Sequence, residues 1–237
     1  MPAIEETIAQ LLACESDVRH KQFASPGEDE YRYLPGSLPV LVSAPHGAVH
    51  TRDVEKEEDE FTAGLALLIG VRTGAHVIYA RRKSRSDPNY TPNNPYKTSL
   101  LQFARQHNIH FVLDLHGAHA SRNFGVALGT MHGKSCSTRE RQLLIETLER
   151  NGISQQGSGL TRLDVDIALP AEGGRDRQTV TGFCKLHRLP AAQLEINARL
   201  RIPPRRQPDE TRQQAVVAMI DILCQLASCL AQPEPGT

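Results

Sequence analysis

The chain has 237 residues, of which 27 are Lys or Arg and 27 are Asp or Glu, so its formal net charge is zero. This balance argues against nucleic acid or an anionic membrane as the main partner, and five widely spaced cysteines without a CxxC pair argue against a disulfide framework or a cysteine-bound zinc ion. The acidic start of the sequence has no apolar leader, and no uninterrupted apolar run approaches the roughly 20 residues of a membrane span, so we expect a cytoplasmic location.

Predicted strands and helices alternate along the sequence. Apolar stripes at helical spacing predict helices over 3–19, 57–73, 96–106, 137–150 and 209–230, with a capping box at Ser137 and Glu140 and a C-cap at Gly74. Short apolar runs predict strands over 38–44, 75–80, 110–115, 125–128 and 193–196, with loops over 21–38 and 88–95 and a frayed tail over 232–237. This pattern predicts one α/β domain over 1–237, with a mostly parallel or mixed sheet flanked by helices on both faces.

Three of these predicted strands end in residues that can carry chemistry. One apolar run leads into His46, another leads into His116, and a third carries Glu195 and Asn197 on one face. In open α/β sheets the ligand site lies beyond the carboxyl ends of the strands. If the three strands are parallel neighbours, these side chains converge, and we expect Asn197 to contact the bound molecule.

Two neutral imidazoles and one carboxylate form the ligand set of a catalytic zinc site. The nearest carboxylates follow the first histidine, in the acidic run over 57–60. The same run has a second interpretation as a solvated helix start, where acidic side chains complement the helix dipole. Asp114 precedes His116 by two residues, so both share one strand face and Asp114 is placed to orient the imidazole. Glu195 taken alone has a structural alternative as the buried partner of an arginine.

Six short motifs follow one another between residues 40 and 201. They are Ala44-Pro45-His46-Gly47, the acidic run, Asp87-Pro88-Asn89, Asp114-Leu115-His116-Gly117, Gly129-Thr130 and Gln193-Leu194-Glu195-Ile196-Asn197. Together they resemble the order seen in the N-formylglutamate amidohydrolase family. The resemblance implies a zinc-carboxypeptidase-like fold, with a mixed sheet flanked by helices.

The resemblance also implies the roles of individual residues. It implies zinc as the cofactor, with His46, His116 and an acidic residue as the metal ligands. Asp59 fits the acidic position best, and Glu58 is the alternative. Glu195 is implied as the carboxylate that activates the attacking water.

The resemblance further places Asn89 near the substrate. The family has an arginine directly after this asparagine, whereas this chain has Tyr90. Because a guanidinium binds a carboxylate in a two-pronged fork, we expect Arg85 to supply the missing positive charge, with Arg122 and Arg175 as alternatives.

The predicted function is therefore zinc-dependent hydrolysis of the amide bond of a small N-acyl amino acid, similar to N-formylglutamate. Two alternatives stay open, namely hydrolysis of γ-glutamyl or peptide amides and a non-catalytic binding protein that keeps the fold. A metal-free α/β hydrolase is disfavoured because the sequence has no Gly-x-Ser-x-Gly elbow. We predict surface positions for His50 and His132, and His119 is a weaker candidate for a fourth ligand or a gate. The expected partner is a small molecule, with neither nucleic acid nor a membrane involved.

Overall fold

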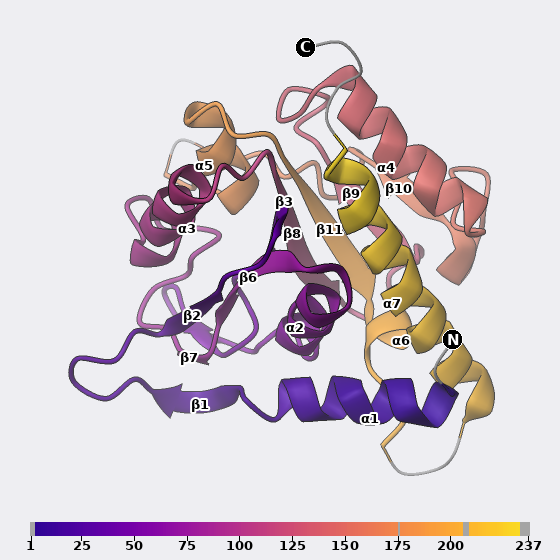
Figure 1. The fold of residues 1–237 in the computed structure, drawn as a ribbon, viewed down its shortest axis with the longest axis horizontal. Coiled ribbons are helices and arrows are strands. Elements are labelled where there is room, and N and C mark those ends of the chain that lie inside the picture. Colours follow the sequence, from indigo (N-terminus) through magenta and orange to yellow (C-terminus); the bar gives the residue numbers. More distant parts are fainter. Residues whose placement is uncertain (1–2, 175, 206–208, 233–237) are drawn as a thin grey trace.

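A mixed sheet of seven strands forms the centre of the computed structural model, which describes residues 3–174, 176–205 and 209–232 (Figure 1). The strands lie in the order β10 (Leu163–Val165), β9 (Val126–Gly129), β11 (Ala191–Asn197), β8 (Phe111–Ala118), β3 (Leu38–Ala44), β6 (Ala75–Ala80) and β2 (Tyr31–Leu34). The central strands β11, β8, β3 and β6 run parallel, while β9 and β2 pair antiparallel to them on the two sides. The predicted α/β fold with a mixed sheet is confirmed.

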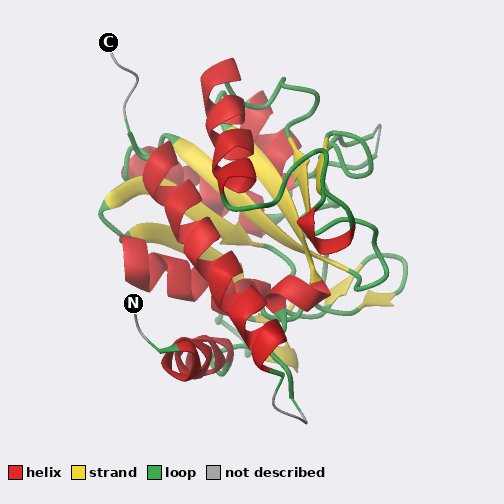
Figure 2. Cartoon of the chain, turned by 90° about the vertical axis from the view of Figure 1, so that its right-hand side faces the viewer, coloured by secondary structure: helices red, strands yellow, loops and turns green. Residues whose placement is uncertain are grey.

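Helices cover both faces of this sheet (Figure 1 and Figure 2). The larger apolar cluster packs α1 (Ile4–Glu15), α2 (Thr62–Thr73), α4 (Thr138–Arg150) and α7 (Glu210–Leu230) against one face. The smaller cluster packs α3 (Pro95–Gln106) and α5 (Val180–Leu186) against the other face. Because both faces are covered, successive residues of β3 alternate between the clusters, with Val40 and Val42 in the first and Leu41 in the second.

The remaining elements are short. They are β1 (Arg19–Phe23), β4 (His50–Thr51), β5 (Glu55–Lys56), β7 (Arg82–Lys83), the 3-10 turn η1 (Gly159–Thr161) and α6 (Ala198–Arg201). Of these, β4, β5 and α6 border the candidate site described below.

Helix α7 is long and apolar enough, by length and composition, to cross a membrane. Its predicted stripe is buried in the core and consists of Val216, Met219, Ile220, Leu223 and Leu226. The core helix of a globular fold passes the same test, so α7 is weak evidence for a membrane span.

Several predicted elements are present, and others were missed. The capping box at the start of α4 and the left-handed Gly74 after α2 are confirmed. The predicted loop over 21–38 is wrong, because it contains β1 and β2. Both strands are exposed or half-buried along their length, and β2 lies at the sheet edge, so neither shows the apolar run of a buried strand. Strand β10 and helices α5 and α6 were also not predicted, and positions 233–237 of the predicted tail lie outside the described residues.

Helix α2 begins later than the sequence predicted. Its first residue is Thr62, so the acidic run over 57–60 precedes the helix, and the first turn holds no acidic side chain. The N–H groups at the start of a helix have no partner within the helix. Here a carboxylate from α1 caps them, since Glu15 accepts hydrogen bonds from the main-chain N–H of Phe61 at 3.1 Å and of Gly64 at 2.8 Å. The acidic run therefore ends one residue before the N-cap Phe61 and does not form the first turn of α2.

Candidate metal centre

The carboxyl ends of β3, β8 and β11 meet at one edge of the sheet, because the three strands are parallel neighbours. His116 on β8 and Glu195 on β11 are register partners, and His46 follows the end of β3. The main-chain N–H of Asp59 donates to the carbonyl of His46 at 2.8 Å. This hydrogen bond brings the acidic segment before α2 to the strand ends.

Three side-chain atoms face one another at this edge. The Nδ1 atoms of His46 and His116 are 3.2 Å apart, and Asp59 Oδ2 lies 3.3 Å from the first and 3.5 Å from the second. Both imidazoles are buried, while the Asp59 side chain is 19% exposed. The structure thus brings together the three residues that the sequence proposed as metal ligands.

Two further aspartates determine which nitrogen of each imidazole faces this group. His46 Nε2 lies 2.8 Å from Asp87 Oδ1, and His116 Nε2 lies 3.0 Å from Asp114 Oδ2. A carboxylate accepts hydrogen bonds, so we assign the Nε2–H tautomer to each neutral imidazole, which leaves both Nδ1 atoms as bare acceptors. The predicted contact between Asp114 and His116 is present, whereas the equivalent role of Asp87 was not predicted.

This arrangement fits a divalent cation. Three acceptors in mutual contact repel one another unless a positive charge lies between them. A tetrahedral zinc ion with bonds of about 2.0–2.1 Å keeps its ligand atoms about 3.3 Å apart. The separations of 3.2, 3.3 and 3.5 Å match that spacing. Three protein ligands also leave a fourth position open, as in catalytic zinc sites.

The carboxylates shift the pKa values of the imidazoles. Burial lowers the pKa of His46, but hydrogen bonds with Asp59 and Asp87 outweigh burial and raise it to about 9. Burial also lowers the pKa of His116, and Asp114 and Asp59 together raise it well above its ordinary value. Burial raises the pKa of Asp59, but its hydrogen bonds with the two imidazoles outweigh burial and hold the pKa well below its ordinary value. Protons therefore compete with a metal ion for the Nδ1 atoms, and metal binding should release protons.

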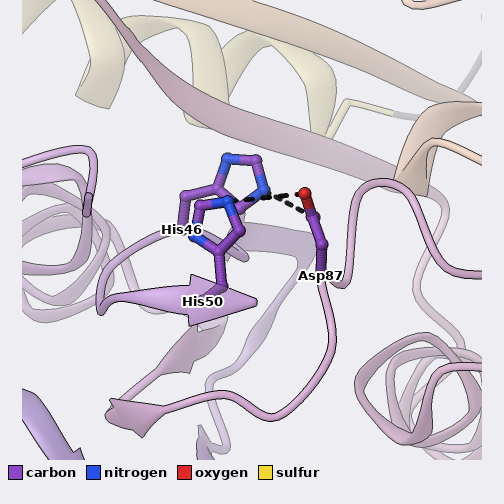
Figure 3. A group of neighbouring side chains, drawn as sticks. All are labelled: His46, His50 and Asp87. Atoms are coloured by element: carbon purple, nitrogen blue, oxygen red, sulfur yellow. Dashed lines mark hydrogen bonds and ion pairs between the residues drawn. The ribbon is translucent and has the colours of Figure 1, made fainter. Parts of the chain in front are cut away.

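A second group of potential ligands shares His46 and includes His50 and Asp87 (Figure 3). His50 stacks on His46 with ring centroids 4.0 Å apart, and its Nε2 lies 3.4 Å from Asp87 Oδ2. The predicted surface position of His50 is wrong, since the residue is 3% exposed. Asp87 also accepts from Arg52 Nε and from the main-chain N–H of Asn89. Because a guanidinium already lies beside Asp87, a second cation is disfavoured here, and the group supports His46 instead.

Glu195 lies beside the three candidate ligands and ends a chain of side-chain amides. Gln193 Nε2 donates to Glu195 at 3.0 Å, and Asn89 Nδ2 lies 3.5 Å from Gln193 Oε1. Asn89 Oδ1 accepts from the main-chain N–H of Val180, at the start of α5. Burial raises the pKa of Glu195, and the nearby charge of His116 offsets only part of that rise. A carboxylate with a raised pKa is suited to take up a proton and pass it on.

Asn197 does not lie free at the site. Its Nδ2 donates to the main-chain carbonyls of Arg122 at 3.2 Å and Phe124 at 3.0 Å, and its Oδ1 accepts from the N–H of Arg199 at 3.0 Å. The residue is fully buried. Its amide therefore caps α6 and holds the neighbouring loop, and the contact of Asn197 with substrate stays a prediction.

The arginines expected at the substrate lie outside this group. The Arg85 side chain is 74% exposed, and its guanidinium lies over the ring of Phe23 and 3.9 Å from Glu30. Arg122 is exposed, and Arg175 lies outside the described residues. The sequence therefore missed the arginine that contacts the site, which is Arg52.

The other candidate ligands face elsewhere. Glu58 Oε1 lies 3.8 Å from His20 Nδ1, and Glu58 does not belong to the group of potential ligands formed by His46, Asp59 and His116. His119 is exposed, and its Nδ1 lies 2.8 Å from Ser121 Oγ. His132 is exposed, as predicted. Geometry thus favours Asp59 over Glu58 as the acidic member of the centre.

A buried arginine behind the centre was also missed. Arg201 on α6 is 5% exposed, donates from Nη1 to the carbonyl of Ala118 at 3.3 Å, and leaves Nε without a partner among the described residues. Its guanidinium occupies the space beside Gly117, where an added Cβ would lie 2.4 Å from Nη2. Gly117 directly follows His116, so the missing side chain lets a positive charge approach the end of β8. Burial lowers the pKa of Arg201, while the charge of Asp59 acts to raise it.

Two solved hydrolases have folds similar to this one. N-formylglutamate amidohydrolase from Ralstonia eutropha JMP134 matches with a TM-score of 0.55 and 16% identity over 85% of this chain and 98% of that chain. A metallo-carboxypeptidase from Pseudomonas aeruginosa matches with a TM-score of 0.50 and 14% identity over 96% of this chain and 69% of that chain. No family model and no curated protein matches the sequence. The resemblance expected from the motifs is thus present in the fold, which is similar to those of N-formylglutamate amidohydrolase and of a metallo-carboxypeptidase.

Proposed function

We propose that the chain is a zinc-dependent amidohydrolase that cleaves the amide bond of a small N-acyl amino acid. The observation that carries the proposal is the mutual contact of three acceptor atoms, His46 Nδ1, His116 Nδ1 and Asp59 Oδ2. The order of motifs and the similarity in fold to N-formylglutamate amidohydrolase support the choice of reaction. The zero net charge supports a small molecule as the partner, rather than nucleic acid or an anionic membrane, and we expect it to be bound in the cytoplasm.

Each residue of the centre has a distinct task. His46, His116 and Asp59 would hold the zinc ion, and Asp87 and Asp114 keep the two imidazoles in the tautomer that ligates. When bound, zinc supplies Lewis-acid chemistry that polarises a carbonyl and lowers the pKa of water to about 7.

Glu195 carries the proton in this mechanism. Its raised pKa and its place beside the ligands suit it to accept a proton from the attacking water and to deliver it to the leaving nitrogen. Gln193 and Asn89 hold the carboxylate in place through the chain of amide contacts. The products would be a carboxylic acid and a free amine.

Metal content is the first test. Protein reconstituted with zinc and freed of excess metal should contain about one zinc ion per chain, and His46→Ala or His116→Ala should remove it. Elemental analysis measures both. Wild-type protein that stays free of zinc after reconstitution would remove the basis of the proposal.

A substrate screen is the second test. Zinc-loaded protein should hydrolyse N-formyl or N-acetyl amino acids faster than γ-glutamyl peptides or ordinary dipeptides, with amine release as the readout. Preferential cleavage of the peptides would favour the alternative of a peptide amide hydrolase. A fully zinc-loaded protein that cleaves none of these compounds would favour a binding role.

A further inference from the structure

The hairpin of β4 and β5 places Arg52 next to the candidate metal centre. Arg52 Nε donates to Asp87 Oδ2, and the other oxygen of Asp87 lies 2.8 Å from His46 Nε2. A single carboxylate therefore separates this guanidinium from a candidate ligand. The turn that presents the arginine is closed by a hydrogen bond of 3.1 Å from the N–H of Arg52 to the carbonyl of Val54.

An aromatic ring fixes the guanidinium from a second direction. Arg52 Cζ lies 4.9 Å from the ring centroid of Tyr90, within the range of a cation–π contact. The Tyr90 carbonyl accepts from the N–H of Gln178 at 2.9 Å, which ties this loop to the segment before α5. The position of Arg52 is thus set by one carboxylate and one ring, both on the loop between β7 and α3.

One edge of this guanidinium stays available. Within the described part of the chain, neither Nη atom of Arg52 takes part in a hydrogen bond, and the side chain is 29% exposed. Arg85 is far more exposed and lies over Phe23, and Arg201 is buried behind β8. Of these three arginines, Arg52 alone both contacts the centre through Asp87 and keeps accessible donors.

We propose that Arg52, seated on Tyr90, binds the carboxylate of the substrate, which makes the preferred substrate an N-acyl amino acid with a free α- or side-chain carboxylate. This inference rests on the proposed function and deepens it. The two Nη atoms present parallel N–H groups that match the two oxygens of a carboxylate. Asp87 and Tyr90 hold the fork in place beforehand, so little side-chain entropy is lost on binding.

The interaction can be tested without turnover, by calorimetric titration of zinc-loaded protein with glutarate and with its neutral diamide. Arg52→Gln should weaken glutarate binding about 10- to 100-fold, because a charged hydrogen-bonded pair is lost. Arg52→Lys should give an intermediate loss, since the charge remains without the fork. Binding of the diamide should be unchanged in both. Arg85→Gln is the matched control and should bind glutarate as the wild type does.

Two results would overturn the assignment. One is unchanged glutarate affinity in Arg52→Gln, or no glutarate binding by the wild type at millimolar concentration. The other is loss of zinc from Arg52→Gln in parallel with loss of glutarate, which would make Arg52 a support for Asp87 and His46. Arg52-dependent glutarate binding by a protein that cleaves no N-acyl amino acid would leave this site standing while the proposed function fails.

Discussion

At the scale of single residues, one carboxylate of the acidic run differs from its neighbours. Asp59 touches both imidazoles, whereas Glu58 turns to His20. Loss of a residue that only orients a metal ligand typically weakens metal binding by about 10- to 100-fold. We expect Asp59→Ala to weaken zinc binding by more than this, because Asp59 is itself a proposed ligand. Competition with a chromophoric chelator measures this affinity. The matched controls Glu57→Ala and Glu58→Ala should bind zinc normally, and equal small losses in all three variants would contradict the assignment.

A substitution at Glu195 can distinguish a role in catalysis from a role in metal binding. Glu195→Gln keeps the size of the side chain and can still meet Gln193, but it cannot accept a proton. We expect kcat to fall by about 10²- to 10⁴-fold while the zinc content stays the same. Lost zinc would instead make Glu195 a ligand, and full activity would require another base.

The pH profile gives an independent signature of the same residue. A base acts in its deprotonated form, so kcat/KM rises as pH increases through its pKa. In the metal-free protein burial raises the pKa of Glu195, and the charge of a bound zinc ion would lower it, so the position of the acid limb reports the balance of these two effects. This limb should be absent from the residual activity of Glu195→Gln. A limb that is unchanged in the variant would assign the titration to another group.

At the scale of elements, β8 and α6 pack closely because Gly117 on β8 has no side chain. Gly117→Ala would place a Cβ 2.4 Å from Arg201 Nη2, so the buried guanidinium has to move. Overpacking of this kind costs about 1–3 kcal/mol of unfolding free energy, measured by urea denaturation. Gly174→Ala is the matched control, because no other residue that the structure describes lies within 4 Å of its added Cβ. If the proposed clash is real, adding Arg201→Met to Gly117→Ala should cost less than the sum of the two single changes.

Elements with apolar runs were predictable, and those formed by tertiary contacts were not. Strands β3 and β8 are buried on both faces and begin with continuous apolar runs, whereas in β11 apolar residues alternate with Gln193, Glu195 and Asn197, and in each case the end of the strand could be located from the sequence. Edge strand β2 is half-buried, and its partner β6 supplies the hydrogen bonds that define it. The start of α2 was misplaced because its cap comes from Glu15, a distant residue that no local pattern reveals.

The same distinction holds for the candidate site: residues at strand ends were predictable, and residues placed by contacts between loops were not. His46, His116 and Glu195 follow from strand ends, which local sequence marks. His50 and Arg52 sit in a hairpin of two short strands, and their approach to Asp87 depends on the packing of separate loops. A histidine or arginine in a loop carries no local signal of such a contact, so these residues required the structure.

At the scale of the whole molecule, Lys97 connects three distant parts of the chain. It lies on α3, is fully buried, and donates from Nζ to the carbonyls of Thr91 at 2.8 Å and Gln178 at 2.7 Å. The first carbonyl belongs to the loop that follows Asp87 and Asn89, and the second to the segment before α5. Lys97 thus ties α3 to the two segments that flank the candidate site.

The contribution of Lys97 to the unfolding free energy should depend on pH, and the direction follows from its pKa. Burial lowers the pKa of Lys97 to about 8, and the charges of Asp87 and Asp114 oppose that shift. An unfolded lysine titrates near about 10.4, so between these values the unfolded state binds more protons than the folded state. The contribution of Lys97 to unfolding free energy therefore rises with pH across this window, by at most about 1.4 kcal/mol per pH unit, and is constant below it.

Lys97→Met tests this prediction, because methionine fills similar space without a donor or a charge. The variant leaves the carbonyls of Thr91 and Gln178 unpaired, at about 1–3 kcal/mol for each buried acceptor, partly offset by removal of the buried ammonium group. We expect urea denaturation to show a less stable variant, with the gap to the wild type widening from pH 7.5 to pH 9.5. The other titrating groups are common to both proteins and cancel in the difference. A gap that is constant over this range would mean that Lys97 keeps its ordinary pKa, and the connection would then be an ordinary charged hydrogen-bond pair.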